Sequence, residues 1–146
     1  MVNKYMEDDA RLIALLELLK SSYWYAKELK EVFKPFDISH EQFNILRILE
    51  YNQKRKFSLK EIQSRILNKT ENTTRLVEKL KLKGFIRSEY SLTNRRTLEI
   101  QLTKDGLQLL DRIKSPLFAL SKRINKKLVI NDSKELIRIL RKMRSA

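Results

Sequence analysis

The sequence of 146 residues contains no cysteine, two glycines, two prolines and a single histidine, His40. The lack of cysteine excludes structural disulfides, thiolate zinc sites and thiol-based redox sensing. The scarcity of glycine and proline argues against an all-β fold built on tight turns. With no phosphate-binding glycine loop and no spaced His/Glu motif, the chain shows no catalytic constellation. We therefore predict no enzyme activity, no catalytic residue, no metal and no cofactor, and we expect His40 to face solvent in a first helical turn.

Long hydrophobic runs are also missing. No stretch approaches the ~18 apolar residues of a membrane-spanning helix. The N-terminal residues MVNKYMEDDARL are acidic and lack the apolar centre of a signal peptide. We therefore expect a cytoplasmic protein without a membrane partner. Hydrophobic residues make up 42% of the chain and charged residues 34%, which is typical of a soluble, helix-rich domain with its own core.

Positive charge is abundant and unevenly distributed. The formal net charge is +14. Residues 1–53 hold seven Lys and Arg against nine Asp and Glu, whereas residues 54–96 hold thirteen against four and residues 97–146 hold twelve against five. An excess that begins at residue 54 predicts a polyanionic partner. An anionic membrane is the rival polyanion, but no helix pairs a basic face with an aromatic one.

The stretch from Ser58 to Thr103 has the order helix, turn, helix, glycine and two short strands. Ser58 and Glu61 form a capping box that starts the first helix. That helix has a short apolar face formed by Ile62, Ile66 and Leu67. We expect Thr70 to cap the second helix and Gly84 to end it in a left-handed conformation. This order is that of a winged helix-turn-helix, a module that lays its second helix in the DNA major groove.

The second helix of this module has polar flanks around an apolar stripe. Thr73 falls beneath the stripe and is expected to point at the core. The other positions carry hydroxyl, amide and cationic groups, the types that read base edges and grip phosphate. We predict DNA contacts by Thr70, Asn72, Thr74, Arg75 and Lys79, and a phosphate contact by Lys69. The alternative interpretation is an ordinary solvated face.

Two strands and a basic loop follow the glycine. Residues 86–91 and 97–102 are short, and Leu98, Ile100 and Leu102 alternate with polar residues at strand period. The loop between them carries adjacent arginines, which suit the negative potential of a narrow minor groove. We predict that its DNA contacts are Thr93, Asn94, Arg95 and Arg96. Alone, the loop would be read as a solvated turn.

Long helices are predicted at both ends of the chain. Residues 5–34 have apolar positions at steps of three and four around more than one face, which requires more than one packing partner. After Thr103 the same spacing passes through Pro116 and favours one kinked helix, with two helices as the alternative. Asn131-Asp132-Ser133 starts a last helix. We predict a mostly α (α+β) fold: residues 1–36 for dimerisation, 37–104 as the winged helix-turn-helix and 105–146 for dimerisation, in one integrated domain.

Several of these segments resemble the MarR family of bacterial transcription regulators. They are Thr74 to Leu80, Gly84-Phe85-Ile86-Arg87, Asn94-Arg95-Arg96 and Leu102-Thr103-Lys104-Asp105-Gly106. By motif, the likeness covers about residues 39–110. One position departs from the family, whose wing has aspartate where this chain has Asn94, so the residue that orients the second arginine lacks a charge. The resemblance implies that Arg96 inserts into the minor groove.

The resemblance also implies a function. We expect a homodimer that binds double-stranded DNA at a pseudo-palindromic operator and represses transcription until a small aromatic effector relieves it. The candidate effector pocket comprises Tyr23, Trp24, Phe33, Phe36 and Phe43, with plain core and dimer packing as the alternative. The competing functions are a non-specific or architectural nucleic-acid-binding protein, which the charge alone would satisfy, and a protein-interaction adaptor.

Overall fold

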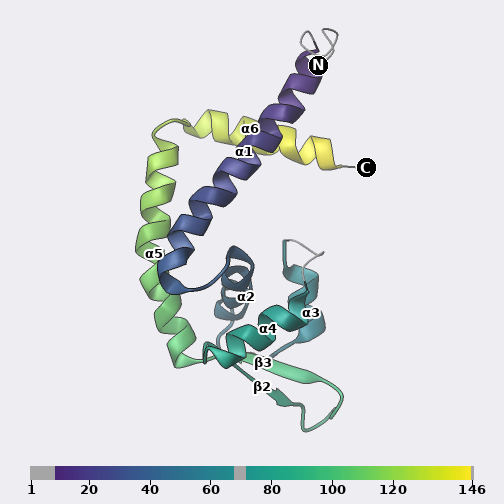
Figure 1. The fold of residues 1–146 in the computed structure, drawn as a ribbon. Coiled ribbons are helices and arrows are strands. Elements are labelled where there is room, and N and C mark those ends of the chain that lie inside the picture. The colour runs from purple at the N-terminus through teal and green to yellow at the C-terminus, as the bar shows by residue number, and fades with distance from the viewer. Residues whose placement is uncertain (1–8, 68–71, 146) are drawn as a thin grey trace, which may run out of the picture.

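A computed structural model describes residues 9–67 and 72–145 of the chain (Figure 1). Long helices form one end of the molecule and a small helical module with a β-hairpin forms the other. The elements in order are α1 (Ala10–Phe33), η2 (Lys34–Phe36), α2 (His40–Glu50), β1 (Phe57–Ser58), α3 (Leu59–Arg65), α4 (Thr73–Leu82), β2 (Ile86–Tyr90), β3 (Leu98–Leu102), α5 (Lys104–Asn125) and α6 (Ile130–Arg144). The predicted mostly α fold is confirmed.

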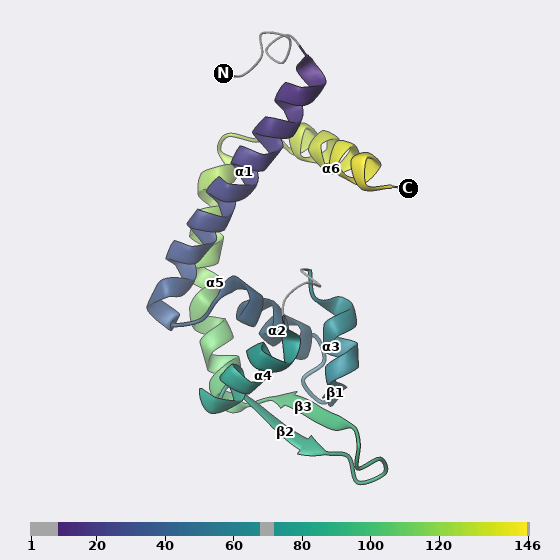
Figure 2. The ribbon, with the colours of Figure 1, turned by 45° about the vertical axis from the view of Figure 1, so that its right-hand side comes forward.

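The module is a winged helix-turn-helix, as predicted. Its three-stranded antiparallel sheet has the order β1-β3-β2, and α2, α3 and α4 pack beside it. The core between helices and sheet includes Phe57, Ile62, Leu80 and Ile100, all fully buried. Beyond this core the β2–β3 hairpin projects away from the helices (Figure 2). The strand β1 was not predicted, because two residues are too few to show a period.

Three helix starts follow from local hydrogen bonds. Ser39 with Gln42 and Ser58 with Glu61 form two complete capping boxes. At the start of α5, the Thr103 hydroxyl accepts a hydrogen bond from the Gly106 N–H at 3.1 Å. These interactions satisfy backbone donors that a helix leaves without partners, which is why the helices begin at these residues.

The sequence was misread at two places around the turn between α3 and α4. The N-cap of α4 is Asn72, whose side-chain oxygen accepts from the Arg75 N–H at 3.1 Å, and not Thr70, which lies outside the described residues. Leu67 is 79% exposed and forms no part of the apolar face of α3. The helix ends at Arg65, and the extended backbone of Ile66 turns the following residue away from the core.

Helix α5 continues through Pro116, which confirms the single long helix and excludes the two-helix alternative. It packs against both α1 and α2 and therefore joins the two ends of the molecule. The last helix begins one residue earlier than predicted, at Ile130, where the Asp132 carboxylate accepts from the Val129 N–H at 3.2 Å.

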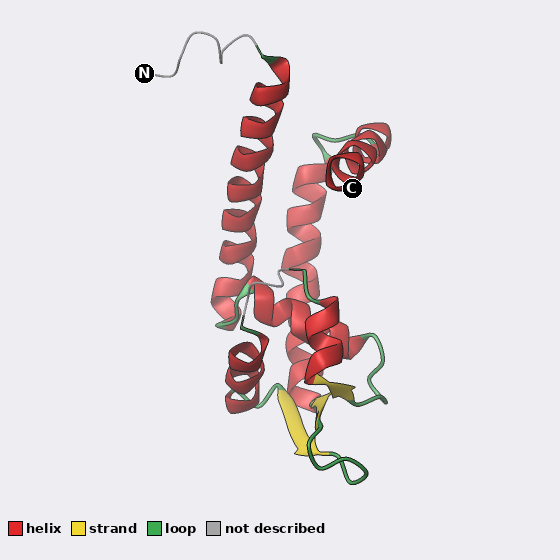
Figure 3. Cartoon of the chain, turned by 90° about the vertical axis from the view of Figure 1, so that its right-hand side faces the viewer, coloured by secondary structure: helices red, strands yellow, loops and turns green. Residues whose placement is uncertain are grey.

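The end of the molecule formed by α1 and α6 exposes large apolar side chains. Helix α1 lies along α5, whereas α6 lies apart from α1 (Figure 3). The exposed residues include Leu15, Leu16, Leu19, Tyr23 and Trp24 of α1 and Leu136, Ile137 and Met143 of α6. Among the described residues, no helix is long and apolar enough to cross a membrane. The three-part division of the chain stays a prediction.

Candidate nucleic-acid interface

The exposed side of α4 carries the described part of the predicted reading surface. Thr73 is 3% exposed and lies in the core with Val77 and Leu80, as the helical period predicted. The predicted contact residues on the remaining faces are exposed, and they are Asn72, Thr74, Arg75 and Lys79. Thr70 and Lys69 lie outside the described residues. The four exposed residues offer amide, hydroxyl and cationic groups from the first two turns of one helix.

The tip of the hairpin presents the second predicted group. Thr93, Asn94, Arg95 and Arg96 are all exposed. The Asn94 side-chain oxygen accepts from the backbone N–H of Arg96 at 3.2 Å, and the Asn94 carbonyl accepts from the Thr97 N–H at 2.8 Å. Asn94 thus shapes the turn through the backbone of Arg96. Within the described residues neither arginine side chain has an ion-pair partner, so both guanidinium groups remain available to an anion.

Three acidic side chains of the module, Glu61, Glu89 and Glu99, are paired with cations outside these two surfaces, whereas Glu78 is exposed on α4. Lys56 lies 3.1 Å from a Glu99 carboxylate oxygen and 3.9 Å from one of Glu89. The hydrogen bond from Lys56 lowers the pKa of Glu99 below its ordinary value. Glu61 pairs with Arg55, and the hydrogen bond from the Ser58 backbone is the main cause that lowers the pKa of Glu61. The lowered pKa values favour the ionised forms of Glu61 and Glu99, and both carboxylates are paired away from α4 and the hairpin tip.

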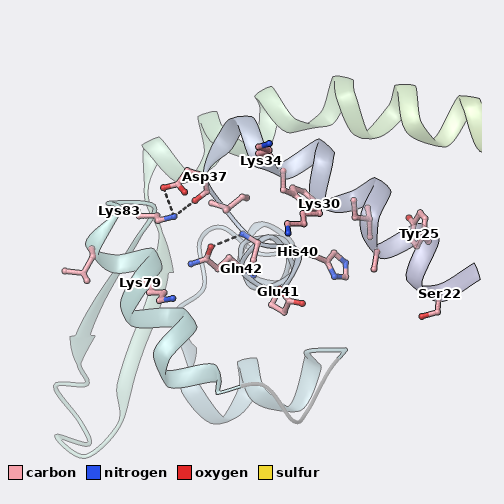
Figure 4. Close-up of a pocket in the computed structure, with 16 residues that line it drawn as sticks. Ser22, Tyr25, Lys30, Lys34, Asp37, His40, Glu41, Gln42, Lys79 and Lys83 are labelled. Carbon is pink, nitrogen blue, oxygen red and sulfur yellow. Dashed lines mark hydrogen bonds and ion pairs between the residues drawn. The ribbon is translucent and has the colours of Figure 1, made fainter. Parts of the chain in front are cut away.

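A cleft of about 990 Å³ lies between α1, the start of α2 and the end of α4 (Figure 4). Its walls combine apolar side chains, among them Leu29 and Phe33, with four lysines. These are Lys30, Lys34, Lys79 and Lys83. Lys83 lies 3.1 Å from a carboxylate oxygen of Asp37 and also donates to the Asp37 carbonyl. This pair ties the end of α4 to the corner between α1 and α2.

The five aromatic residues of the predicted effector pocket do not come together in this cleft. Phe33 lines it, while Tyr23 and Trp24 are exposed on α1 away from it. Phe43 stacks on Phe33 with ring centroids 4.7 Å apart and lines a separate groove between α2 and α5. Phe36 lies under the guanidinium group of Arg112.

Other residues of the cleft were not predicted. His40 is half-buried, with its ring 6.1 Å from that of Phe33, and the expectation that it faces solvent was wrong. It lines the cleft because the corner before α2 folds the first turn of that helix back toward α1. The four lysines come from α1, η2, α4 and the C-cap of α4. The sequence shows the four-residue spacing within each pair, Lys30 with Lys34 and Lys79 with Lys83, but not that the two pairs meet.

Fold and surface together define a winged helix-turn-helix protein with cationic groups on its second helix and on its wing. The model of the MarR family matches residues 38–98. The *Escherichia coli* HTH-type transcriptional regulator PapX is 30% identical over 83 residues, which cover 57% of this chain and 51% of PapX. The chain thus matches about half the length of this curated relative.

Solved structures resemble nearly the whole chain. A MarR transcription factor from Planctomyces limnophilus is 28% identical, with a TM-score of 0.72 over 92% of this chain and 97% of that one. A mutant of *Escherichia coli* MarR in complex with operator DNA is 19% identical, with a TM-score of 0.77 over 94% of this chain and 100% of that one. Residues 38–98 therefore match the MarR family, and the chain as a whole resembles solved MarR transcription regulators in its fold.

Proposed function

We propose that the protein is a homodimeric, sequence-specific DNA-binding regulator of transcription. The observation that carries the proposal is the pair of separate cationic surfaces, one on α4 and one on the hairpin tip, whose arginines have no acidic partner among the described residues. Arg75 and Asn72 read base edges in the major groove, and Arg96 enters the adjacent minor groove. Lys79, with Lys69, contacts phosphate.

The dimer rests on the exposed apolar side chains of α1 and α6. The exposed apolar surface, which includes Leu15, Leu19 and Trp24, is larger than a soluble monomer normally leaves uncovered. A second copy of the chain covers it. A two-fold axis through these helices places two modules on one face. They then bind half-sites one helical turn apart on a pseudo-palindromic operator.

The test begins with selection of bound duplexes from a random DNA pool, followed by affinity measurements at several salt concentrations. Arg75→Ala is expected to lose ~1–3 kcal/mol and to relax base preference at one position. Lys79→Ala is expected to weaken all sequences alike and to reduce the salt slope by about one. Lys134→Ala on exposed α6 is the control and leaves DNA affinity unchanged.

The competing functions predict other results. Similar affinity for selected and scrambled duplexes at physiological salt would identify a non-specific or architectural DNA-binding protein. A complete absence of DNA binding would favour an adaptor that uses the winged helix for protein contacts. Loss of affinity in Lys79→Ala that is confined to the selected duplex would contradict the phosphate contact.

The proposal also includes regulation by an effector. The protein represses transcription until a small molecule binds in the cleft and releases it from DNA. Apolar walls with four lysines suit an aromatic compound that carries an acidic group. The cleft adjoins the end of α4, so an occupant that attracts Lys83 competes with Asp37 and alters the position of the helix.

Aromatic carboxylates and phenols are to be titrated into the complex of protein and selected duplex. An effector releases the wild type from DNA, whereas Lys83→Met requires a higher concentration of the same compound. The control is Lys114→Met, which removes a lysine from the separate groove between α2 and α5. If the same effector concentration releases Lys83→Met and the wild type from DNA, Lys83 takes no part in effector binding.

A further inference from the structure

The two faces of the hairpin differ in chemistry. Opposed residues of antiparallel strands share a face, and successive residues alternate between faces. The register pairs Ile86 with Leu102, Ser88 with Ile100 and Tyr90 with Leu98 on the inner face, where Ile86, Ile100 and Leu102 are buried in the core. The outer face pairs Arg87 with Gln101 and Glu89 with Glu99.

Beyond the buried pairs, the inner face ends with Tyr90 and Leu98, and Leu98 still packs against the core. Tyr90 is 68% exposed and Leu98 opposite it is half-buried. Leu92 lies in the loop after β2, outside the strand register, and is 98% exposed. We call Tyr90, Leu92 and Leu98 the wing stripe. An isolated exposed leucine needs no explanation, but here two exposed apolar side chains and a half-buried one belong to the same hairpin. That hairpin projects from the helices (Figure 2).

Charge indicates what covers the wing stripe. Both carboxylates of the hairpin strands, Glu89 and Glu99, lie on the opposite face, where Lys56 pairs with them. The stripe itself carries no charge and is bordered at the tip by Arg95 and Arg96. The DNA minor groove offers the complementary surface, since its walls are apolar deoxyribose and its rims are anionic phosphate. The stripe is also continuous with the arginine tip assigned to that groove.

We propose that the wing stripe packs against the sugar walls of the minor groove beside Arg96 and makes the protein prefer A·T pairs there. Guanine differs from the other bases in this groove by its exocyclic N2 amino group, which projects toward the groove surface. That group holds an apolar side chain away from the floor and loses hydrogen bonds to water when it is covered. The inference rests on the proposed DNA binding and adds an uncharged determinant of specificity.

The first experiment measures how Leu92→Ser and Tyr90→Ser change affinity for the selected duplex and the salt dependence of that affinity. Each variant is expected to bind about tenfold more weakly, because an apolar side chain no longer leaves water on binding. The salt slope stays that of the wild type, since no counterion release is lost, whereas Arg96→Ala lowers it. Tyr51→Ser is the control, because Tyr51 is 87% exposed at the end of α2, away from the wing.

The second experiment changes the base pairs under the wing. Replacing A·T by G·C in the flank is expected to weaken wild-type binding, and replacing the guanine by inosine, which lacks the N2 amino group, restores it. Leu92→Ser discriminates less than the wild type among the three duplexes. Thermal unfolding of the variants matches that of the wild type, because the replaced side chains are exposed.

Three outcomes overturn the inference. The first is wild-type affinity in both stripe variants, and the second is full discrimination between the G·C and inosine duplexes in Leu92→Ser. Either result contradicts only this inference and leaves the proposed DNA binding intact. A wild-type protein that binds no duplex from the pool overturns this inference and the proposed function together.

Discussion

Replacing Gly106 by alanine tests how tightly the start of α5 packs against the wing. A Cβ atom on Gly106 would lie 2.2 Å from the carbonyl oxygen of Phe85 and 2.7 Å from Cδ1 of Leu102. That carbonyl already accepts a hydrogen bond from the Thr103 N–H at 3.1 Å. The Thr103 hydroxyl also donates to the Gly84 carbonyl at 2.6 Å. The Phe85 carbonyl therefore cannot rotate aside without breaking its hydrogen bond with Thr103, which holds the start of α5 to the residues before β2.

Two opposing effects determine the stability of Gly106→Ala. Alanine has a better helix propensity than glycine and would stabilise α5 by up to ~1 kcal/mol. The contact with backbone forces a shift that costs ~1–3 kcal/mol, as overpacked sites do. Loss of one or both Thr103 hydrogen bonds adds ~1 kcal/mol. We expect a net loss of about 2 kcal/mol in the free energy of unfolding.

Urea unfolding at one protein concentration measures this change, with the concentration held fixed because the proposed subunit association would contribute to stability. Gly84→Ala is the matched control. Gly84 has φ +77° and nothing within 4 Å of a built Cβ, so its replacement costs only the left-handed backbone conformation, ~1 kcal/mol. The expected order of stability is wild type, Gly84→Ala, Gly106→Ala. A Gly106→Ala variant as stable as the wild type would refute the close packing.

Three other substitutions test the cap, the charge and the dimer. Asn72→Asp keeps a capping oxygen for the Arg75 N–H, so thermal unfolding is unchanged or raised, but its carboxylate lowers DNA affinity at least tenfold. Glu61→Gln removes a charge whose pKa is lowered in the folded state, so the wild type is the more stable above pH 4.5 and this advantage disappears as pH falls through the lowered pKa, as urea midpoints would record. Leu19→Glu places a charge in the exposed apolar surface of α1 and shifts sedimentation from dimer to monomer. Normal DNA binding by a stable Asn72→Asp would contradict a DNA contact at residue 72. A stability difference for Glu61→Gln that does not change with pH would contradict the lowered pKa, and a dimeric Leu19→Glu would contradict pairing through α1.

Local signals in the sequence were sufficient for most of the fold. Ser39, Ser58 and Thr103 begin helices through side-chain oxygens that act within three residues, so the sequence shows them directly. Gly84 ends α4 with φ +77°, as its position after the last apolar residue predicted. Thr70 and Asn72 are both good caps two positions apart, and only the path of the turn decides between them.

The cleft was harder to predict because it is made of distant segments. Lys30 and Lys83 are far apart in the sequence and meet only after α1 and α4 have packed around α2. Tyr23 and Trp24 belong to an apolar surface that faces away from the module, although their spacing relative to Phe33 is that of one helix. The spacing of apolar residues along a helix identifies which residues share a face. It does not identify the neighbouring element against which that face packs.

Helix α5 is a rod of 22 residues that reaches from the wing toward the end of the molecule formed by α1 and α6. At a rise of 1.5 Å per residue it is about 33 Å long, so a tilt of about 5° at one end moves the other by about 3 Å. That displacement is close to the ~3.4 Å step between stacked base pairs. Pro116 removes one backbone hydrogen bond near the middle and marks where the rod bends most easily. In the proposed dimer, a small rearrangement among the paired helices is thereby magnified into a displacement of about one base step, so that release from the proposed operator needs no large hinge.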